Sequence, residues 1–214
     1  TGDGGGLYSN GGAPQLTTVT FRGNRADNGG GGMFVQNGNP TLSQVTFASN
    51  TAAYSGGGFY NVFGSPALDR AIFTGNTASF GYGGGLFNST GHPTLVNAVF
   101  RANTASFDGG GISSYGGNLR LTNVTLHGNA ANAAGASYKG GGVSITGTSG
   151  SPTLTNCILW GNTASSSAQI NKGSLTNLTV AYSIVQDGYG GTGNKTGDPL
   201  FIDAAGGNLD LRAG

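Results

Sequence analysis

The residues that could perform acid–base chemistry are aspartates, and the sequence spreads them out. The chain has eight Asp and no Glu. A glycosidase needs two carboxylates flanking one bond, and a polysaccharide lyase needs an acid cluster with a base that takes a proton. Asp3 and Asp108 occupy equivalent positions before glycine runs, but they lie far apart. Asp69 and Arg70 are adjacent, which is typical of a solvated ion pair. We therefore expect no catalytic residues and no enzyme; a lyase or hydrolase is the alternative.

Candidate metal ligands are equally scattered. Asp187, Asp198 and Asp203 could bind calcium near the C-terminal end, but Asp198 precedes a proline, which is typical of a turn. His92 and His127 occupy different places in the repeat described below, which argues against a shared metal. The sequence predicts neither a metal nor a cofactor.

Two sets of aromatic residues are the strongest candidates for a binding surface. One set follows the inward residue after each glycine run, and the other lies four residues after a recurrent asparagine: Tyr8, Phe34, Tyr60 and Phe87, then Tyr54, Phe80 and Phe107. If both sets are exposed, they flank a glycine floor and form an unusually large apolar face. Such a face could stack against the sugar rings of a polysaccharide or pack against another copy of the chain. The alternative is that one set covers the other or lies inside.

These residues are positioned by an internal repeat. Six asparagines close a phrase of similar composition at separations of 26, 26, 27, 26 and 33 residues: Asn24, Asn50, Asn76, Asn103, Asn129 and Asn162. A glycine triplet precedes each phrase. The repeat spans about residues 3 to 186, so we expect one elongated array over 1–186. Residues 187–214 are predicted to be an irregular last coil packing on the end of that array.

The repeat predicts an all-β protein, a single right-handed parallel β-helix of about seven coils. Each copy has three short strands with alternating inward and outward residues, separated by Gly, Asn and Pro bends. Residues one repeat apart then stack about 4.8 Å apart. Phe21, Phe47, Phe73 and Phe100 should form one interior file. The asparagines should turn inward at a corner and bond to their neighbours, and Cys157, in a Val/Ala position, should be a core thiol.

The repeat motifs resemble those of known surface proteins. "GGGLY", "GGGMF" and "GGGLF" with "FRGN", "FASN", "FTGN" and "FRAN" resemble the GGA(I/L) and FxxN repeats of polymorphic outer membrane proteins, which are β-helical adhesins. The tail "GDPLFIDAAGGNLDLRAG" resembles the end of bacterial choice-of-anchor Q β-helix proteins, although the chain lacks the Ser-Pro-Ala-Ile-Asp run that usually follows. These resemblances imply a β-helix at the cell surface or outside the cell, and they imply no catalytic residues.

Composition limits the partners. Because the net charge is only +1, no basic surface for nucleic acid is expected. The fraction of hydrophobic residues is 36%. No segment is apolar for long enough to cross a membrane. We expect a non-catalytic structural or adhesive protein that self-associates into a fibre or layer; the alternative is a polysaccharide-binding or lyase-like module. An ice-binding role would need a regular threonine array, and the best candidate column is mixed: Thr20, Thr46, Ile72, Val99, Thr125 and Ile158.

Overall fold

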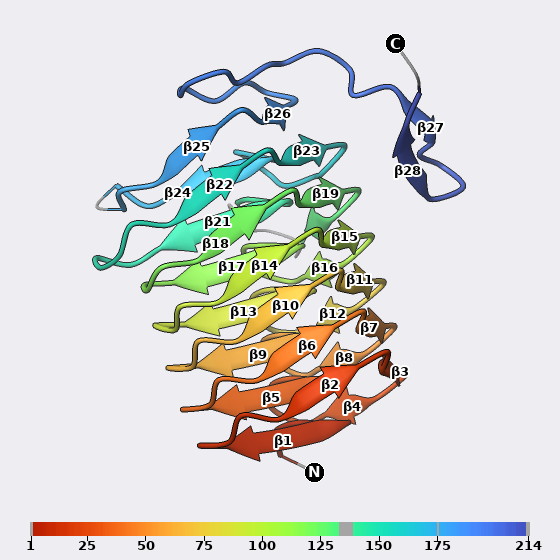
Figure 1. The fold of residues 1–214 in the computed structure, drawn as a ribbon, viewed down its shortest axis with the longest axis vertical. Coiled ribbons are helices and arrows are strands. Elements are labelled where there is room, and N and C mark those ends of the chain that lie inside the picture. The colour runs from red at the N-terminus through yellow and green to blue at the C-terminus, as the bar shows by residue number, and fades with distance from the viewer. Residues whose placement is uncertain (1, 133–138, 175, 213–214) are drawn as a thin grey trace.

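Three parallel sheets of seven strands each run along the long axis of the molecule (Figure 1). The computed structural model describes residues 2–132, 139–174 and 176–212. Each coil contributes one strand to each sheet, and paired residues such as Leu7 and Met33 are one repeat apart. The chain is therefore an all-β parallel solenoid of about seven coils with a repeat of roughly 26 residues, as the sequence predicted.

The strands are short, and each sheet gathers equivalent strands of successive coils. The first sheet contains β1 (Leu7–Asn10), β5 (Met33–Gln36), β9 (Phe59–Val62), β13 (Leu86–Ser89), β17 (Ile112–Tyr115), β21 (Val143–Thr146) and β24 (Ile170–Lys172). The second contains β2 (Gln15–Thr17), β6 (Thr41–Ser43), β10 (Ala67–Asp69), β14 (Thr94–Val96), β18 (Arg120–Thr122), β22 (Thr153–Thr155) and β25 (Thr179–Ala181). The third contains β3 (Thr20–Arg22), β7 (Thr46–Ala48), β11 (Ile72–Thr74), β15 (Val99–Arg101), β19 (Thr125–His127), β23 (Ile158–Trp160) and β26 (Ile184–Val185).

A fourth sheet was not expected from the sequence. Its two-residue strands follow the recurrent asparagine in five coils: β4 (Arg25–Ala26), β8 (Thr51–Ala52), β12 (Thr77–Ala78), β16 (Thr104–Ala105) and β20 (Ala130–Ala131). The small alanine of each strand faces the interior and is almost fully buried. Two residues are too few to show an alternating pattern, which explains why the sequence suggested three strands per repeat.

The core is a set of identical or similar side chains stacked from coil to coil. Phe21, Phe47, Phe73 and Phe100 form a single file, with ring centroids 5.1, 4.7 and 4.3 Å apart in turn. Their rings are within 10° of parallel. Since offset stacking adds to the gain from burying these large apolar surfaces, the file is a main source of stability. This file was the central geometric prediction, and it is confirmed.

The predicted asparagine column is a buried ladder. The backbone N and the Nδ2 of Asn50 both donate to Oδ1 of Asn76, at 3.0 and 2.9 Å. Nδ2 of Asn50 also donates to the carbonyl oxygen of Phe21. The donation of both nitrogens to the next Oδ1 repeats from Asn24 to Asn162, and Nδ2 of Asn162 continues to Gln169. The ladder thus saturates polar groups that the corner would otherwise bury unpaired.

The corner between the second and third sheets holds one residue with left-handed backbone in every coil. Its φ lies between 51° and 56° in seven successive coils: Thr18, Gln44, Arg70, Asn97, Asn123, Asn156 and Tyr182. Asn readily adopts this conformation, whereas Arg and Tyr pay about 1–2 kcal/mol for it. The hydrogen-bonded stack of coils therefore imposes the corner geometry on residues that do not prefer it.

The C-terminal segment divides into an end cap and a flanking hairpin. Near the last coil, the Asn194 side chain accepts a hydrogen bond from Ser183 N and donates one to Val180 O. Further on, β27 (Phe201–Asp203) and β28 (Asn208–Leu211) form an antiparallel hairpin beside the third sheet (Figure 1). Phe201 packs edge-on against His127. The expectation placed all of 187–214 on the end of the array; the hairpin instead lies on its side.

The described residues contain no helix with the length and apolarity needed to cross a membrane.

Candidate binding site on the first sheet

Two columns of side chains point away from the core on the first sheet. One passes through the second residue of each strand and the other through the fourth, because the first residue of each strand packs in the core. The first column runs Tyr8, Phe34, Tyr60, Phe87, Ser113, Ser144 and Asn171. It therefore changes from aromatic to small polar side chains between β13 and β17.

The four aromatic rings of this column contact one another. Centroid distances are 5.3 Å from Tyr8 to Phe34, 5.0 Å to Tyr60 and 4.9 Å to Phe87. Tyr8 is 49% exposed, but Phe34 is only 6% exposed between its neighbours. The coil spacing brings successive rings into contact, so they cover one another. The seven aromatics therefore do not form one continuous exposed face, because the neighbours of Phe34 in its own column cover it.

The second aromatic set lies on the turns that follow the fourth sheet. Tyr54 is 56% exposed and Phe80 69% exposed, whereas Phe107 is half-buried. Tyr82 contacts both sets, with its ring centroid 5.2 Å from Phe107 and 6.0 Å from Phe87. A tyrosine therefore links the two sets where the sequence suggested only glycines.

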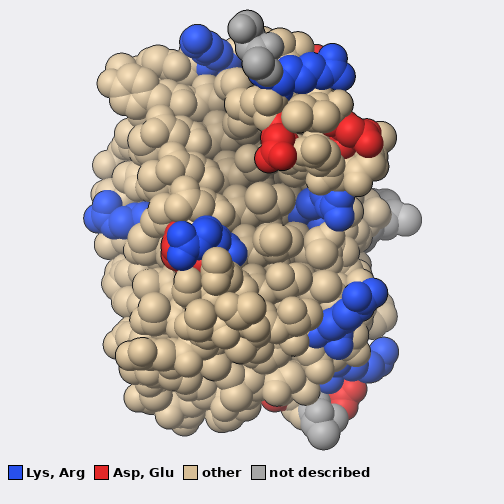
Figure 2. Space-filling model, turned by 45° about the vertical axis from the view of Figure 1, so that its right-hand side comes forward, with Lys and Arg blue, Asp and Glu red and all other residues tan. Residues whose placement is uncertain are grey.

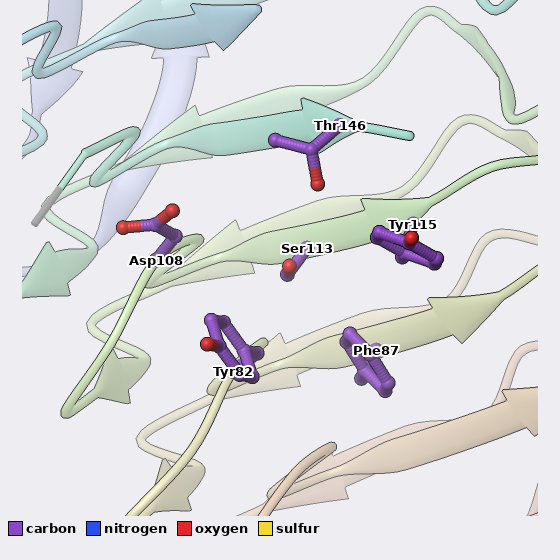
Figure 3. A pocket seen from close by; sticks show the side chains of 6 residues that line it. All are labelled: Tyr82, Phe87, Asp108, Ser113, Tyr115 and Thr146. Carbon is purple, nitrogen blue, oxygen red and sulfur yellow. The ribbon is translucent and has the colours of Figure 1, made fainter. Parts of the chain in front are cut away.

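A pocket of about 410 Å³ opens where the aromatic column ends. It is lined by Tyr82, Phe87, Asp108, Ser113, Tyr115 and Thr146. Ser113 takes the place in the column that Phe87 holds one coil earlier, so a ring-sized space is left above Phe87. In Figure 3, Ser113 lies between Tyr115 on one side and Tyr82 with Asp108 on the other.

The polar groups of the pocket are held in place by the coil geometry. Oδ1 of Asp108 accepts a hydrogen bond of 2.8 Å from the backbone N of Lys139 in the next coil. Ser113 is 4% exposed, and its hydroxyl makes no hydrogen bond to any described residue. The pocket thus offers one oriented carboxylate and one available hydroxyl among aromatic walls.

The repeat pattern of the sequence does not reveal most of this pocket. Tyr115 is three residues after the inward Ile112, so alternation along β17 should have placed it outward. Tyr82 directly precedes a glycine triplet, in the same place as Asp108 one coil later. The sequence contains both signals, but each tyrosine is the only one in its column, so neither belongs to a repeated pattern.

Asp69, Asp198 and Asp203 make local structural contacts. Asp69 and Arg70 form an exposed ion pair of 2.9 Å. Asp198 accepts a hydrogen bond from Leu200 N, as a turn-forming residue does, and Asp203 accepts one from Gly206 N. Within the described residues, no three metal-ligating side chains come together.

The two histidines and the cysteine also make contacts within the fold. His127 Nδ1 hydrogen-bonds to the carbonyl of Trp160, and burial lowers the pKa of its ring. His92 accepts a hydrogen bond from Asn118 N. Cys157 is 1% exposed, and burial raises the pKa of its thiol to about 11. Because the thiolate is the reactive form, this thiol is inert at neutral pH, as expected of a core residue.

Charged side chains are sparse and separated on the face that Figure 2 shows. Lys and Arg are dispersed there among neutral residues, and the acidic residues form no broad patch. This distribution agrees with the low charge of the sequence and gives that face no strong electrostatic field.

No family model matches the chain, and neither a curated protein nor a solved structure matches it. The fold and the pocket define the class: a parallel β-solenoid with an aromatic-walled pocket on its first sheet.

Proposed function

We propose that this protein is a non-catalytic, extracellular or cell-surface adhesive β-solenoid that binds a polysaccharide through the pocket on its first sheet. The observation that carries the proposal is the pocket itself, where Tyr82 and Tyr115 are 42% and 56% exposed around a polar floor. A sugar ring has apolar faces and a polar rim. Aromatic walls with a few placed polar groups complement both features.

The direction of the aromatic column suits an elongated ligand. The pocket lies at the end of a file of rings that starts at Tyr8 and follows the solenoid axis. The exposed ring of Tyr8 and the half-buried rings of Tyr60 and Phe87 extend the apolar surface beyond the pocket, with the buried Phe34 between them. A polymer lying along the first sheet could therefore contact several coils at once, which favours a polysaccharide over a single small sugar.

Two further points support binding without catalysis. Among the described residues, the pocket lining contains one carboxylate, that of Asp108, whereas glycoside hydrolysis uses two. The repeat motifs resemble those of surface-exposed adhesins, and this resemblance supports a location outside the cell.

Replacing Tyr115 by alanine is expected to weaken polysaccharide binding about fivefold, because one aromatic contact contributes on the order of 1 kcal/mol. A panel of insoluble polysaccharides is first tested for retention of the wild-type protein. A binding isotherm is then measured with the polysaccharide that retains it best. Folding should not change, since Tyr115 is 56% exposed.

Tyr182→Ala is the matched control, because Tyr182 is 61% exposed at the corner between the second and third sheets. It should bind like the wild type. If both variants lose affinity equally, or if the wild type retains no polymer, the proposal is wrong.

Self-association into a fibre or layer is the second candidate function. It is favoured by Tyr54 and Phe80, which lie on the same turn of adjacent coils and are 56% and 69% exposed. The net charge of +1 gives little repulsion between copies.

A double change of Tyr54 and Phe80 to serine is expected to shift assemblies toward monomers, because it removes the exposed apolar surface. Sedimentation velocity at several protein concentrations measures this shift, with Tyr182→Ser as the control of similar exposure. A wild-type protein that stays monomeric at every concentration would contradict the second candidate.

A further inference from the structure

The charge and the rings of the pocket point to a particular kind of ligand group. Asp108 is the charged residue in the lining, and it makes no ion pair to any described residue. Tyr82 and Phe87 lie side by side, with ring centroids 6.0 Å apart and planes 27° from parallel. Tyr115 lies across Ser113 from Tyr82 and Asp108, on the same side as Phe87 (Figure 3). Three aromatic rings around a space next to a carboxylate are suited to a cation, which is attracted both to the π faces and to the negative charge.

The carboxylate is fixed rather than free to turn away. Its Oδ1 holds the backbone N of Lys139 at 2.8 Å, and its Oδ2 has no described hydrogen-bond partner. The same backbone contact occurs in the first coil, where Oδ1 of Asp3 accepts from Gly29 N at 3.0 Å. This hydrogen bond to the next coil therefore recurs in the solenoid. Asp108 differs from Asp3 in that a pocket surrounds it.

We infer that this pocket is an ammonium-binding subsite, and that the polysaccharide it takes carries unacetylated amino sugars. The second part rests on the proposed function; the first part does not. The ammonium group would lie between Tyr82 and Tyr115, facing Asp108, and a neighbouring hydroxyl of the ligand could pair with Ser113, whose own hydroxyl lacks a described partner.

The experiment uses two matched pairs of probes with the whole chain. The first pair is a chitosan oligosaccharide and a chitin oligosaccharide of equal length, which differ in N-acetylation. The second pair is choline and 3,3-dimethylbutan-1-ol, which have the same shape and differ in charge. Calorimetry or NMR titration gives each affinity, and we expect the cationic member of each pair to bind about tenfold more tightly.

Asp108→Asn is the decisive variant, because asparagine keeps an Oδ1 that can accept from Lys139 N and loses only the charge. It should abolish the preference for the cation in both pairs. Asp3→Asn, which makes the equivalent change in the first coil, should leave the preference intact.

Each outcome decides between the proposals. Equal binding of the charged and neutral members, no binding of choline, or an unchanged preference in Asp108→Asn would overturn the ammonium subsite. Saccharide binding without preference would leave the proposed function standing and refute the subsite. Choline binding without saccharide binding would support the ammonium subsite. It would refute both the proposed polysaccharide-binding function and the inference that the polysaccharide carries amino sugars.

Discussion

Gly57→Ala is expected to destabilise the fold by about 3 kcal/mol or more, the upper end of what overpacking costs. A Cβ at Gly57 would lie 2.4 Å from Gly84 O and 2.5 Å from Thr77 O. Both atoms belong to the backbone of the neighbouring coil, which is hydrogen-bonded along its length. No side chain can rotate to relieve the clash, so the coils themselves would have to separate. Chemical denaturation followed by circular dichroism measures the loss.

The control is a glycine that has a left-handed backbone conformation but open space where a Cβ would lie. Gly128 has φ +62°, and a Cβ there would meet nothing within 4 Å. Ala102 occupies the equivalent place one coil earlier with φ 53°, so alanine is tolerated in this turn. Gly128→Ala should therefore cost only about 1 kcal/mol of backbone strain. Equal denaturation midpoints for the two variants would show that close coil packing is not what the glycine triplet provides.

Asn76→Ala is the second change with a large expected effect, again about 3 kcal/mol or more. The Asn76 side chain accepts from both nitrogens of Asn50 and donates to Phe47 O and to Asn103 Oδ1. Its removal leaves Asn50 N and Phe47 O buried without these partners. Each unpaired buried group costs about 1–3 kcal/mol. The free energy of unfolding, from urea titration, is the quantity to compare.

Asn10→Ala is the reference for that measurement. Asn10 is exposed at the end of β1, so its loss should change stability by no more than about 0.5 kcal/mol. A similar free energy of unfolding for Asn10→Ala and Asn76→Ala would mean that the ladder contributes little.

The two structural predictions bear on the pocket as well. The backbone contact from Asp108 to Lys139 N depends on coils that stack in register. The glycine triplet and the asparagine ladder maintain that register at neighbouring corners. Variants that loosen either one should lower ligand affinity indirectly, so affinity measurements need variants such as Asp108→Asn that leave the stacking contacts in place.

The sequence by itself determined the repeat, the solenoid and the ladder. Periodicity is sufficient for these features because every coil pairs with its neighbours through residues one repeat apart. Phe47, Phe73 and Asn76 could be assigned from spacing alone, since an inward position recurs with the same residue type. A second interior ladder, from Asn61 to Asn88, escaped notice because its column also contains Ser9 and Val35.

Only the tertiary structure decided which aromatic rings are available to a ligand. Alternation predicts the direction of Phe34 but not its burial, because neighbouring rings cover it once the coils stack. The pocket depends on a departure from the repeat, in which Ser113 replaces a ring while Tyr82 and Tyr115 come from other columns. Periodic patterns reveal what every coil shares. A pocket formed where one coil differs from the rest arises from packing in three dimensions, and spacing along the chain does not record it.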